Sequence, residues 1–307
     1  MRTVGKFDAI WKEIVMKIGL VGLGRMGGAM VQRLRKMNCD VIGWDINSAA
    51  IEKAVANGLT PVSGPSEVAN TANHIISIIT EDAGVRSIFQ DENGFLSTDL
   101  GGKLFIEMST CRPMTSRELA PKIESAGGRI IDCPVLGTIP QVLEGKLHGL
   151  AGGNSTDLEH AMPVLKKLTQ SVRHMGKLGN GCAMKLTINM GMVAYMQSLA
   201  ETLALGQQQG LTQEQMLDVM SLSPIASGWL DVKTPILKGE KGPVSLDLRT
   251  MRKDMMSAVA TGTATGVPLP AASGALSSIS SAVGNGWGDL DIAELPRFFR
   301  EHMVQQF

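Results

Sequence analysis

Three glycines early in the chain have the spacing of a phosphate-binding turn. They lie in Gly22-Leu23-Gly24-Arg25-Met26-Gly27, between an apolar run at 17–21 and a helical pattern at 28–36. In a GxGxxG turn the first glycine allows the tight bend, the second lets a pyrophosphate approach the backbone, and the third lets the helix pack on the strand. The helix N-terminus then offers N–H groups to the phosphates. These six residues therefore predict a dinucleotide site.

A carboxylate follows where such a site needs one. Asp45 ends the second strand-like run, about 20 residues after the glycine turn, where an acceptor for the ribose hydroxyls is expected. The structural alternative is that Asp45 caps the next helix together with Asn47. Asp45 would repel a 2′-phosphate and no arginine follows it, so we expect NAD rather than NADP as the cofactor.

The elements that must position this site alternate between two patterns. Short β-branched runs occur at 17–21, 41–44, 75–79, 104–106 and 130–131, with helical patterns between them. Several of these runs are apolar throughout, as expected for strands that helices cover on both faces. We predict an α/β domain of the Rossmann type, built on a doubly wound parallel sheet.

After residue 178 the strand-like runs nearly vanish. Helices are expected at 182–209, 212–221, 246–262, 270–283 and 291–305, and the first of these is long enough to form the spine of a second domain. We therefore predict an N-terminal extension (1–15), a Rossmann dinucleotide-binding domain (16–178) and an all-helical domain (179–307) for substrate binding and oligomerisation.

Charge and hydropathy exclude several classes of protein. The 29 basic and 29 acidic residues balance and form no run of like charge, which argues against a nucleic-acid or membrane-surface binder. No apolar run reaches the roughly 18 residues needed to span a bilayer. Residues 1–15 mix both charges, which favours a frayed extension or an early start codon over a transit peptide. A cytoplasmic protein is expected.

The cysteines and histidines are scattered. Cys39, Cys111, Cys133 and Cys182 form no CxxC pair, and no two histidines share one helical turn. We expect free thiols in a reducing compartment and no metal site.

From Met16 the chain resembles the 3-hydroxyisobutyrate dehydrogenase, or β-hydroxyacid dehydrogenase, family almost to its end. Four motifs carry the resemblance: the glycine turn continued to Met30, Met108-Ser109-Thr110 with Pro113, the segment 132–138 followed by Glu144-Gly145, and 181–189 with a later Lys253-Asp254. The resemblance implies a Rossmann domain followed by a helical domain, in the 6-phosphogluconate dehydrogenase-like superfamily.

The fourth motif implies the catalytic groups. Gly181, Lys185 and Asn189 match the family's GxxxKxxxN and line one helical face, with Gly181 leaving room for a ligand beside the amine. Spacing alone favours a solvated lysine. The resemblance makes Lys185 the proton-transfer group and carbonyl polariser, and Asn189 the group that orients the substrate. Desolvation in a cleft would lower the lysine pKa from about 10.4 toward the range of a base.

Further residues receive roles from the resemblance and from their positions. The loop of Ser109 and Thr110 is expected beside the nicotinamide, with Ser109 on the substrate's acid group. Lys253 is expected to close the cofactor site, the alternative being a surface lysine. Thr80 and Glu81 follow a predicted strand, where a parallel sheet binds ligands, although an ordinary helix cap is equally compatible.

The third motif departs from the family pattern. Leu136-Gly137-Thr138 stands where the family usually has Ser-Gly-Gly, so the serine hydroxyl that commonly meets the substrate carboxylate is missing. The N–H groups of the Gly137 turn and the Thr138 hydroxyl are expected to bind the acid group instead. The expected reaction is the NAD-dependent interconversion of a short β-hydroxy acid and its semialdehyde. The motifs do not choose among hydroxyisobutyrate, 3-hydroxypropionate, tartronate semialdehyde and sulfolactaldehyde-like compounds.

Four alternatives remain open or are disfavoured. An imine reductase of this superfamily usually lacks a lysine at the position of Lys185. An aldehyde reductase of the same superfamily is a further alternative. A dinucleotide-binding module without catalysis would not need that lysine, and 6-phosphogluconate dehydrogenases have a longer helical domain. Apolar side chains in the helical half favour a homodimer or homotetramer.

Overall fold

A six-stranded parallel sheet forms the base of the molecule in the computed structural model, which describes residues 15–304. Its strand order is β3-β2-β1-β4-β5-β6. The strands are β1 (Lys17–Val21), β2 (Asp40–Trp44), β3 (Thr60–Pro61), β4 (His74–Ser77), β5 (Leu104–Glu107) and β6 (Arg129–Asp132). The order reverses between β1 and β4, and the carboxyl ends of strands at such a reversal are where open parallel sheets bind ligands. The predicted doubly wound sheet is confirmed, and β3 was missed because two residues carry no pattern.

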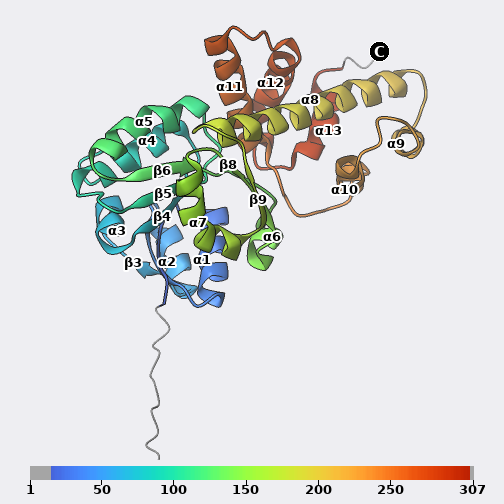
Figure 1. Cartoon of the computed structure of the whole chain (residues 1–307). Helices are drawn as coiled ribbons and strands as arrows, with labels where there is room; N and C mark the ends of the chain where they lie inside the picture. Colours follow the sequence, from blue (N-terminus) through green and yellow to red (C-terminus); the bar gives the residue numbers. More distant parts are fainter. Residues whose placement is uncertain (1–14, 305–307) are drawn as a thin grey trace, which may run out of the picture.

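Helices cover both faces of this sheet (Figure 1). One core joins the sheet to α1 (Arg25–Lys36), α2 (Ser48–Ala56), α6 (Ile139–Glu144) and α7 (Ser155–Leu168). The other joins it to α3 (Pro65–Thr71), α4 (Asp82–Gln90), η1 (Phe95–Ser97) and α5 (Pro113–Ser125). In the second core Phe89, Phe95 and Phe105 pack with ring centroids 4.8–5.1 Å apart. Burial on both faces explains why the strands lack a polar alternation.

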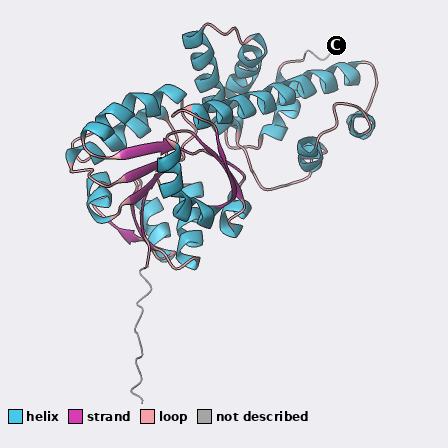
Figure 2. Ribbon diagram, in the orientation of Figure 1, coloured by secondary structure: helices cyan, strands magenta, loops and turns pink. Residues whose placement is uncertain are grey.

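A second, small sheet was not predicted. It consists of β7 (Val135–Leu136), β8 (Leu147–Ala151) and β9 (Thr169–His174), in that order. β7 runs antiparallel to β8, and β9 runs parallel to it. Figure 2 shows these strands beside the main sheet, close to the start of the helical region. The sheet region therefore contains a small mixed sheet in addition to the predicted parallel sheet.

The remaining described chain is helical and has its own core. It contains α8 (Asn180–Gln208), α9 (Gln213–Ser221), α10 (Gly228–Leu237), α11 (Leu248–Thr265), α12 (Pro270–Ala282), η2 (Val283–Trp287), η3 (Ile292–Glu294) and α13 (Leu295–His302). As expected, α8 is the spine of this region and extends from the sheet to its far end (Figure 1). α10 was not predicted, and α13 is shorter than the predicted 291–305. The predicted extension 1–15 lies outside the described residues except for Val15. Across residues 15–304, no helix combines the length and the apolar character needed to cross a bilayer.

Candidate active site

The glycine turn has the sterics that its spacing predicts. Gly22 has φ +95°, and a Cβ there would stand 2.2 Å from the carbonyl oxygen of Ile78. A Cβ on Gly27 would stand 1.9 Å from the carbonyl oxygen of Gly22. Gly24, by contrast, has nothing within 4 Å of its Cβ position. Two glycines are therefore needed for packing, and the third leaves open space beside the backbone at the start of α1.

Asp45 connects the end of β2 to this turn. Its Oδ2 accepts a hydrogen bond from the Leu23 N–H at 2.6 Å, and its Oδ1 accepts one from the Asn47 N–H at 2.8 Å. The N-cap of α2 is Asn47, whose side chain accepts from the Ala49 N–H. Asp45 is thus not the cap of α2, and each of its oxygens keeps a lone pair for a further donor.

Hydrogen bonds from the segment after β4 and from α11 hold the loop after β5 in place. The Ser109 hydroxyl accepts a hydrogen bond from the Ile79 N–H at 2.7 Å, and this side chain is 1% exposed. The Thr110 carbonyl oxygen accepts from the Lys253 amine at 2.7 Å. Thr110 and Lys253 therefore lie together, and their contact with a cofactor stays a prediction. The predicted contact between the Ser109 hydroxyl and a substrate finds no support in this buried position.

Thr80 and Glu81 lie at the carboxyl end of β4. Thr80 is exposed there, and Glu81 is the N-cap residue of α4 without a side-chain hydrogen bond. Glu81 therefore occupies the N-cap position of α4, but its side chain does not cap the helix. The predicted contact of Thr80 with a cofactor stays a prediction.

Asp132, at the end of β6, anchors the helix that carries Lys185. Its two carboxylate oxygens accept from the N–H groups of Gly179 at 2.6 Å and Cys182 at 2.7 Å. The first turn of α8 otherwise lacks partners for these N–H groups. Burial raises the pKa of Asp132, although these two hydrogen bonds oppose that rise. The sequence analysis did not assign this role, because the two partners lie 47 and 50 residues further along the chain.

One prediction about α8 is wrong. Gly181 was expected to leave room for a ligand, but a Cβ there would stand 2.1 Å from the Leu150 carbonyl oxygen and 2.8 Å from an Asp132 oxygen. β8 and Asp132 fill that space. Glycine is required at this position so that α8 can pack closely on the small sheet.

Further along α8, Lys185 and Asn189 meet the start of α11. The Asn189 amide donates to Asp254 Oδ2 at 2.6 Å, and the Lys253 amine lies 2.7 Å from Asp254 Oδ1 as an ion pair without hydrogen-bond geometry. The Lys185 side chain is only partly exposed, and burial lowers the pKa of its amine while Asp254 raises it and Lys253 lowers it further. Across residues 15–304, no protein hydrogen bond or ion pair occupies this amine.

The segment predicted to bind the substrate is ordered by its own contacts. Gly137 has φ +130°, which favours glycine, and follows Leu136 at the end of β7. Thr138 is the N-cap of α6, and both its N–H and its hydroxyl donate to the Gln141 side chain. Among the described residues, no hydrogen bond joins Leu136, Gly137 or Thr138 to α8, and Asp132 makes the hydrogen bonds between this segment and that helix. The substrate role of Leu136, Gly137 and Thr138 stays a prediction.

A buried carboxyl group lies beneath the Ser109 loop and was not predicted. Glu107 accepts from the Ser77 hydroxyl at 2.5 Å and the Ser109 N–H at 2.8 Å, and it is fully buried. Burial raises its pKa from 4.5 to about 7, despite both hydrogen bonds. Glu107 is thus held in the neutral form through the acidic range, close to the candidate site.

This carboxyl group makes the folding stability depend on pH. Between pH 4.5 and 7 folded Glu107 holds a proton that the unfolded chain has released, so its contribution falls as pH rises, by on the order of 3 kcal/mol in total. We expect Glu107→Gln to abolish this fall with pH. The free energy of unfolding of the variant, minus that of the parent, should therefore be larger at pH 8 than at pH 4.5. Urea denaturation across this range measures the effect. The exposed Glu52→Gln is the control, and an unchanged slope in Glu107→Gln would contradict the prediction.

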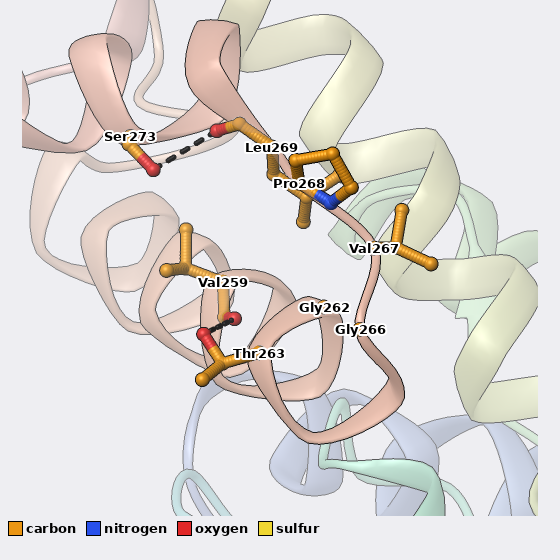
Figure 3. A pocket seen from close by; sticks show the side chains of 8 residues that line it. All are labelled: Val259, Gly262, Thr263, Gly266, Val267, Pro268, Leu269 and Ser273. Carbon is orange, nitrogen blue, oxygen red and sulfur yellow. Dashed lines mark hydrogen bonds between the residues drawn. The ribbon is translucent and has the colours of Figure 1, made fainter.

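Two grooves lie elsewhere, on the helical region. Figure 3 shows the first, of about 410 Å³, between the end of α11 and the start of α12. The second, of about 530 Å³, lies among α8, α12 and α13. Neither contains a predicted site residue, and the lining of the first carries no ionisable side chain. The candidate site therefore rests on the contacts around Lys185 and the glycine turn, which supply the groups for chemistry.

Comparisons with known proteins agree with this arrangement. Residues 17–176 match the model of the NAD binding domain of 6-phosphogluconate dehydrogenase, and residues 179–299 match the NAD-binding domain of NADP-dependent 3-hydroxyisobutyrate dehydrogenase. The chain is 31% identical to glyoxylate/succinic semialdehyde reductase 1 of Arabidopsis thaliana, over 93% of this chain and all of that protein. It is 30% identical to the cytokine-like nuclear factor N-PAC of Xenopus tropicalis, over 92% of this chain but 53% of that relative.

Solved structures extend the comparison. The 3-hydroxyisobutyrate dehydrogenase of Mycobacterium tuberculosis with L-serine superposes with a TM-score of 0.84 at 26% identity, covering 94% of this chain and all of that one. An imine reductase variant from Myxococcus stipitatus shares the fold, with a TM-score of 0.64 at 19% identity over 92% and 99% of the two chains. Two family models, a full-length relative and the solved enzyme thus agree with the motifs. The chain belongs to the 3-hydroxyisobutyrate dehydrogenase family of NAD(P)-dependent oxidoreductases.

Proposed function

We propose that this chain interconverts a short β-hydroxy acid and its semialdehyde with NAD, using Lys185 as the acid and base. The observation that carries the proposal is the Lys185 amine on the anchored helix α8. It is partly desolvated, it lies near Asp254, and it has no hydrogen-bond or ion-pair partner among residues 15–304. The names of two relatives, a semialdehyde reductase and a hydroxy-acid dehydrogenase, support the same substrate class.

The glycine turn fits the cofactor. Open space beside Gly24 admits a phosphate group, and the first N–H groups of α1 lie there as donors. Asp45 would hold the ribose hydroxyls with its remaining lone pairs, and Thr110 and Lys253 would border the nicotinamide. When bound, the dinucleotide supplies the hydride acceptor for the alcohol or the hydride donor for the aldehyde.

Lys185 handles the proton in both directions. In oxidation its neutral amine takes the proton of the substrate hydroxyl, and the amine becomes an ammonium ion. In reduction that ammonium ion hydrogen-bonds to the aldehyde oxygen and returns the proton as the alcohol forms. Burial favours the neutral amine and Asp254 favours the charged one, so both forms are accessible. Asn189, which donates to Asp254, fixes this carboxylate and leaves its own amide oxygen to a substrate hydroxyl.

Cofactor choice tests the role of Asp45. We expect a higher kcat/KM with NAD than with NADP, because the carboxylate repels a 2′-phosphate. Asp45→Ser should lower kcat/KM with NAD and narrow the preference by about tenfold, equivalent to roughly 1.4 kcal/mol. Absorbance of the reduced nicotinamide, measured against a panel of β-hydroxy acids and semialdehydes, reports both. Asp40→Asn, an exposed change at the start of the strand that Asp45 follows, is the control. Equal turnover with NADP in the parent would refute the role of Asp45.

A second candidate function is a dinucleotide-binding module without catalysis, since one relative is named as a nuclear factor and not as an enzyme. This alternative predicts binding of NADH without turnover of any hydroxy acid or semialdehyde. The free amine of Lys185 supports the enzyme over the module, since binding alone does not require it.

We also propose a homodimer or homotetramer in the cytoplasm. Exposed apolar side chains on the helical region, Leu205, Val219, Leu222 and Val232 among them, support association with a second copy. Sedimentation of the purified protein measures the subunit number. The four cysteines are free and buried, which agrees with a reducing compartment.

A further inference from the structure

Arg25, within the glycine turn, makes an ion pair with a residue 222 positions away. Its guanidinium bonds to Asp247 Oδ2, immediately before α11. Of the ion pairs among residues 15–304, this is the one that joins the sheet region to the helical region. Arg25 is also the first residue of α1, so the pair stands at the helix end where a pyrophosphate would bind.

Asp247 is the fixed partner of this pair. It is the N-cap of α11, with Oδ1 accepting from the Thr250 N–H at 2.7 Å, and its side chain is 9% exposed. Its backbone bridges to Asp291, which in turn accepts the buried Lys233 amine. Burial would raise the pKa of Asp247, but the hydrogen bonds from Thr250 and Arg25 lower it below its ordinary value. Asp247 is therefore charged and immobile.

Arg25 is the adaptable partner. Its side chain is 61% exposed, and the bond to Asp247 is its one protein hydrogen bond among the described residues. A guanidinium has five N–H donors in a planar fork, so four remain after this bond. Without Asp247 so exposed a side chain would sample many rotamers, and binding would have to order it at an entropic cost. The ion pair removes that cost in advance.

A second contact lies further along the same helix. The Lys253 amine reaches the Thr110 carbonyl oxygen, six residues after Asp247, or about 9 Å along the helix axis. The first two turns of α11 thus contact the sheet region at the glycine turn and at the loop after β5. A dinucleotide bound at this edge of the sheet would lie beside both contacts.

We propose that Asp247 is a cofactor-positioning residue, which aims the Arg25 guanidinium at the pyrophosphate and holds the start of α11 over the dinucleotide. This inference rests on the dinucleotide binding proposed above but not on the identity of the hydroxy acid. It assigns Arg25 a phosphate contact and Asp247 none, because Asp247 acts through Arg25.

The test uses Asp247→Asn, which removes the charge while keeping an N-cap acceptor for the Thr250 N–H. We expect the Kd of the full-length protein for NADH to rise about tenfold, with kcat within twofold of the parent. ADP-ribose, which has the pyrophosphate but no nicotinamide, should show the same loss. Arg25→Met should lose at least as much affinity, and Arg25→Lys should retain part of it. Isothermal titration calorimetry measures the Kd of both ligands.

Arg249→Met is the matched control, because Arg249 lies in the first turn of α11 and makes an exposed ion pair with Asp289. Among the described residues, its side chain makes no hydrogen bond or ion pair with the glycine turn. It should leave both Kd values unchanged. An unchanged Kd in Asp247→Asn, or a fall in kcat without a change in Kd, would overturn the role of Asp247. If the parent binds NADH but oxidises no hydroxy acid, the substrate proposal fails while the Kd comparison still decides this one. If the parent binds neither NADH nor ADP-ribose, both are wrong.

Discussion

Replacing Lys185 by alanine is expected to lower kcat by about 10²–10⁴-fold, the usual contribution of a general acid and base. The Kd for NADH should stay within twofold of the parent, because the side chain is assigned to proton transfer and not to the glycine turn. The loss should appear in both directions, since one amine takes the proton in oxidation and returns it in reduction. Single-direction loss would contradict that shared role.

An arginine variant and a pH profile distinguish proton transfer by Lys185 from stabilisation by its positive charge alone. Lys185→Arg keeps the positive charge but cannot lose its proton at accessible pH, so it should be as inactive as the alanine variant. Retained activity in the arginine variant would show that charge alone suffices. In the parent, kcat for oxidation should rise with pH through a lysine pKa lower than the ordinary 10.5, because burial favours the neutral amine. Thr187→Ala, an exposed change two residues along α8, is the control and should be fully active.

The part of this site that the sequence predicted is the part determined locally. The crowding around Gly22 and Gly27 follows from the backbone of a strand, turn and helix, so spacing was enough to predict it. Lys185 and Asn189 lie on one helix, as the spacing of their motif predicted, and their catalytic roles stay a prediction. The start of α8 was predicted two residues late. It depends on hydrogen bonds from its first N–H groups to Asp132, which lies on a strand distant in the sequence.

The part that was missed depends on contacts between distant segments. Gly181 was expected to face a ligand, but only the position of β8 shows that Leu150 occupies that space. The small sheet escaped prediction because β7 has two residues and β9 carries polar side chains at an edge. Glu107 gave no signal, since a carboxyl group at a strand end looks like any exposed acid until two neighbouring strands bury it.

Lys233→Met is the second change with a large expected effect, here on stability. The Lys233 amine donates to both oxygens of Asp291 at 2.7 and 2.8 Å and to the Ser245 hydroxyl at 2.7 Å. Lys233 and Asp291 are 2% and 3% exposed. Removing one partner of a buried ion pair leaves the other charge uncompensated, at a cost of about 3–5 kcal/mol. We expect a loss of this size in the free energy of unfolding, measured by urea denaturation at one fixed protein concentration.

The cause of that loss can be separated from lost packing, because methionine keeps most of the lysine volume. Adding Asp291→Asn to Lys233→Met removes the uncompensated charge while keeping an acceptor for the Ser245 N–H, so the double variant should regain more than half of the loss. Burial raises the pKa of Asp291, but the Lys233 amine and two backbone N–H groups together hold it below its ordinary value. The stability from this pair is therefore complete above that ordinary value and is lost as pH falls through the folded pKa. The deficit of Lys233→Met should therefore shrink in acid, where Asp291 takes up a proton. Lys238→Met breaks an exposed pair with Asp218 and should cost less than about 1 kcal/mol. The loss of stability in Lys233→Met could instead be independent of pH and unchanged in the double variant. That result would mean that packing of the Lys233 side chain, and not its charge, stabilises this region.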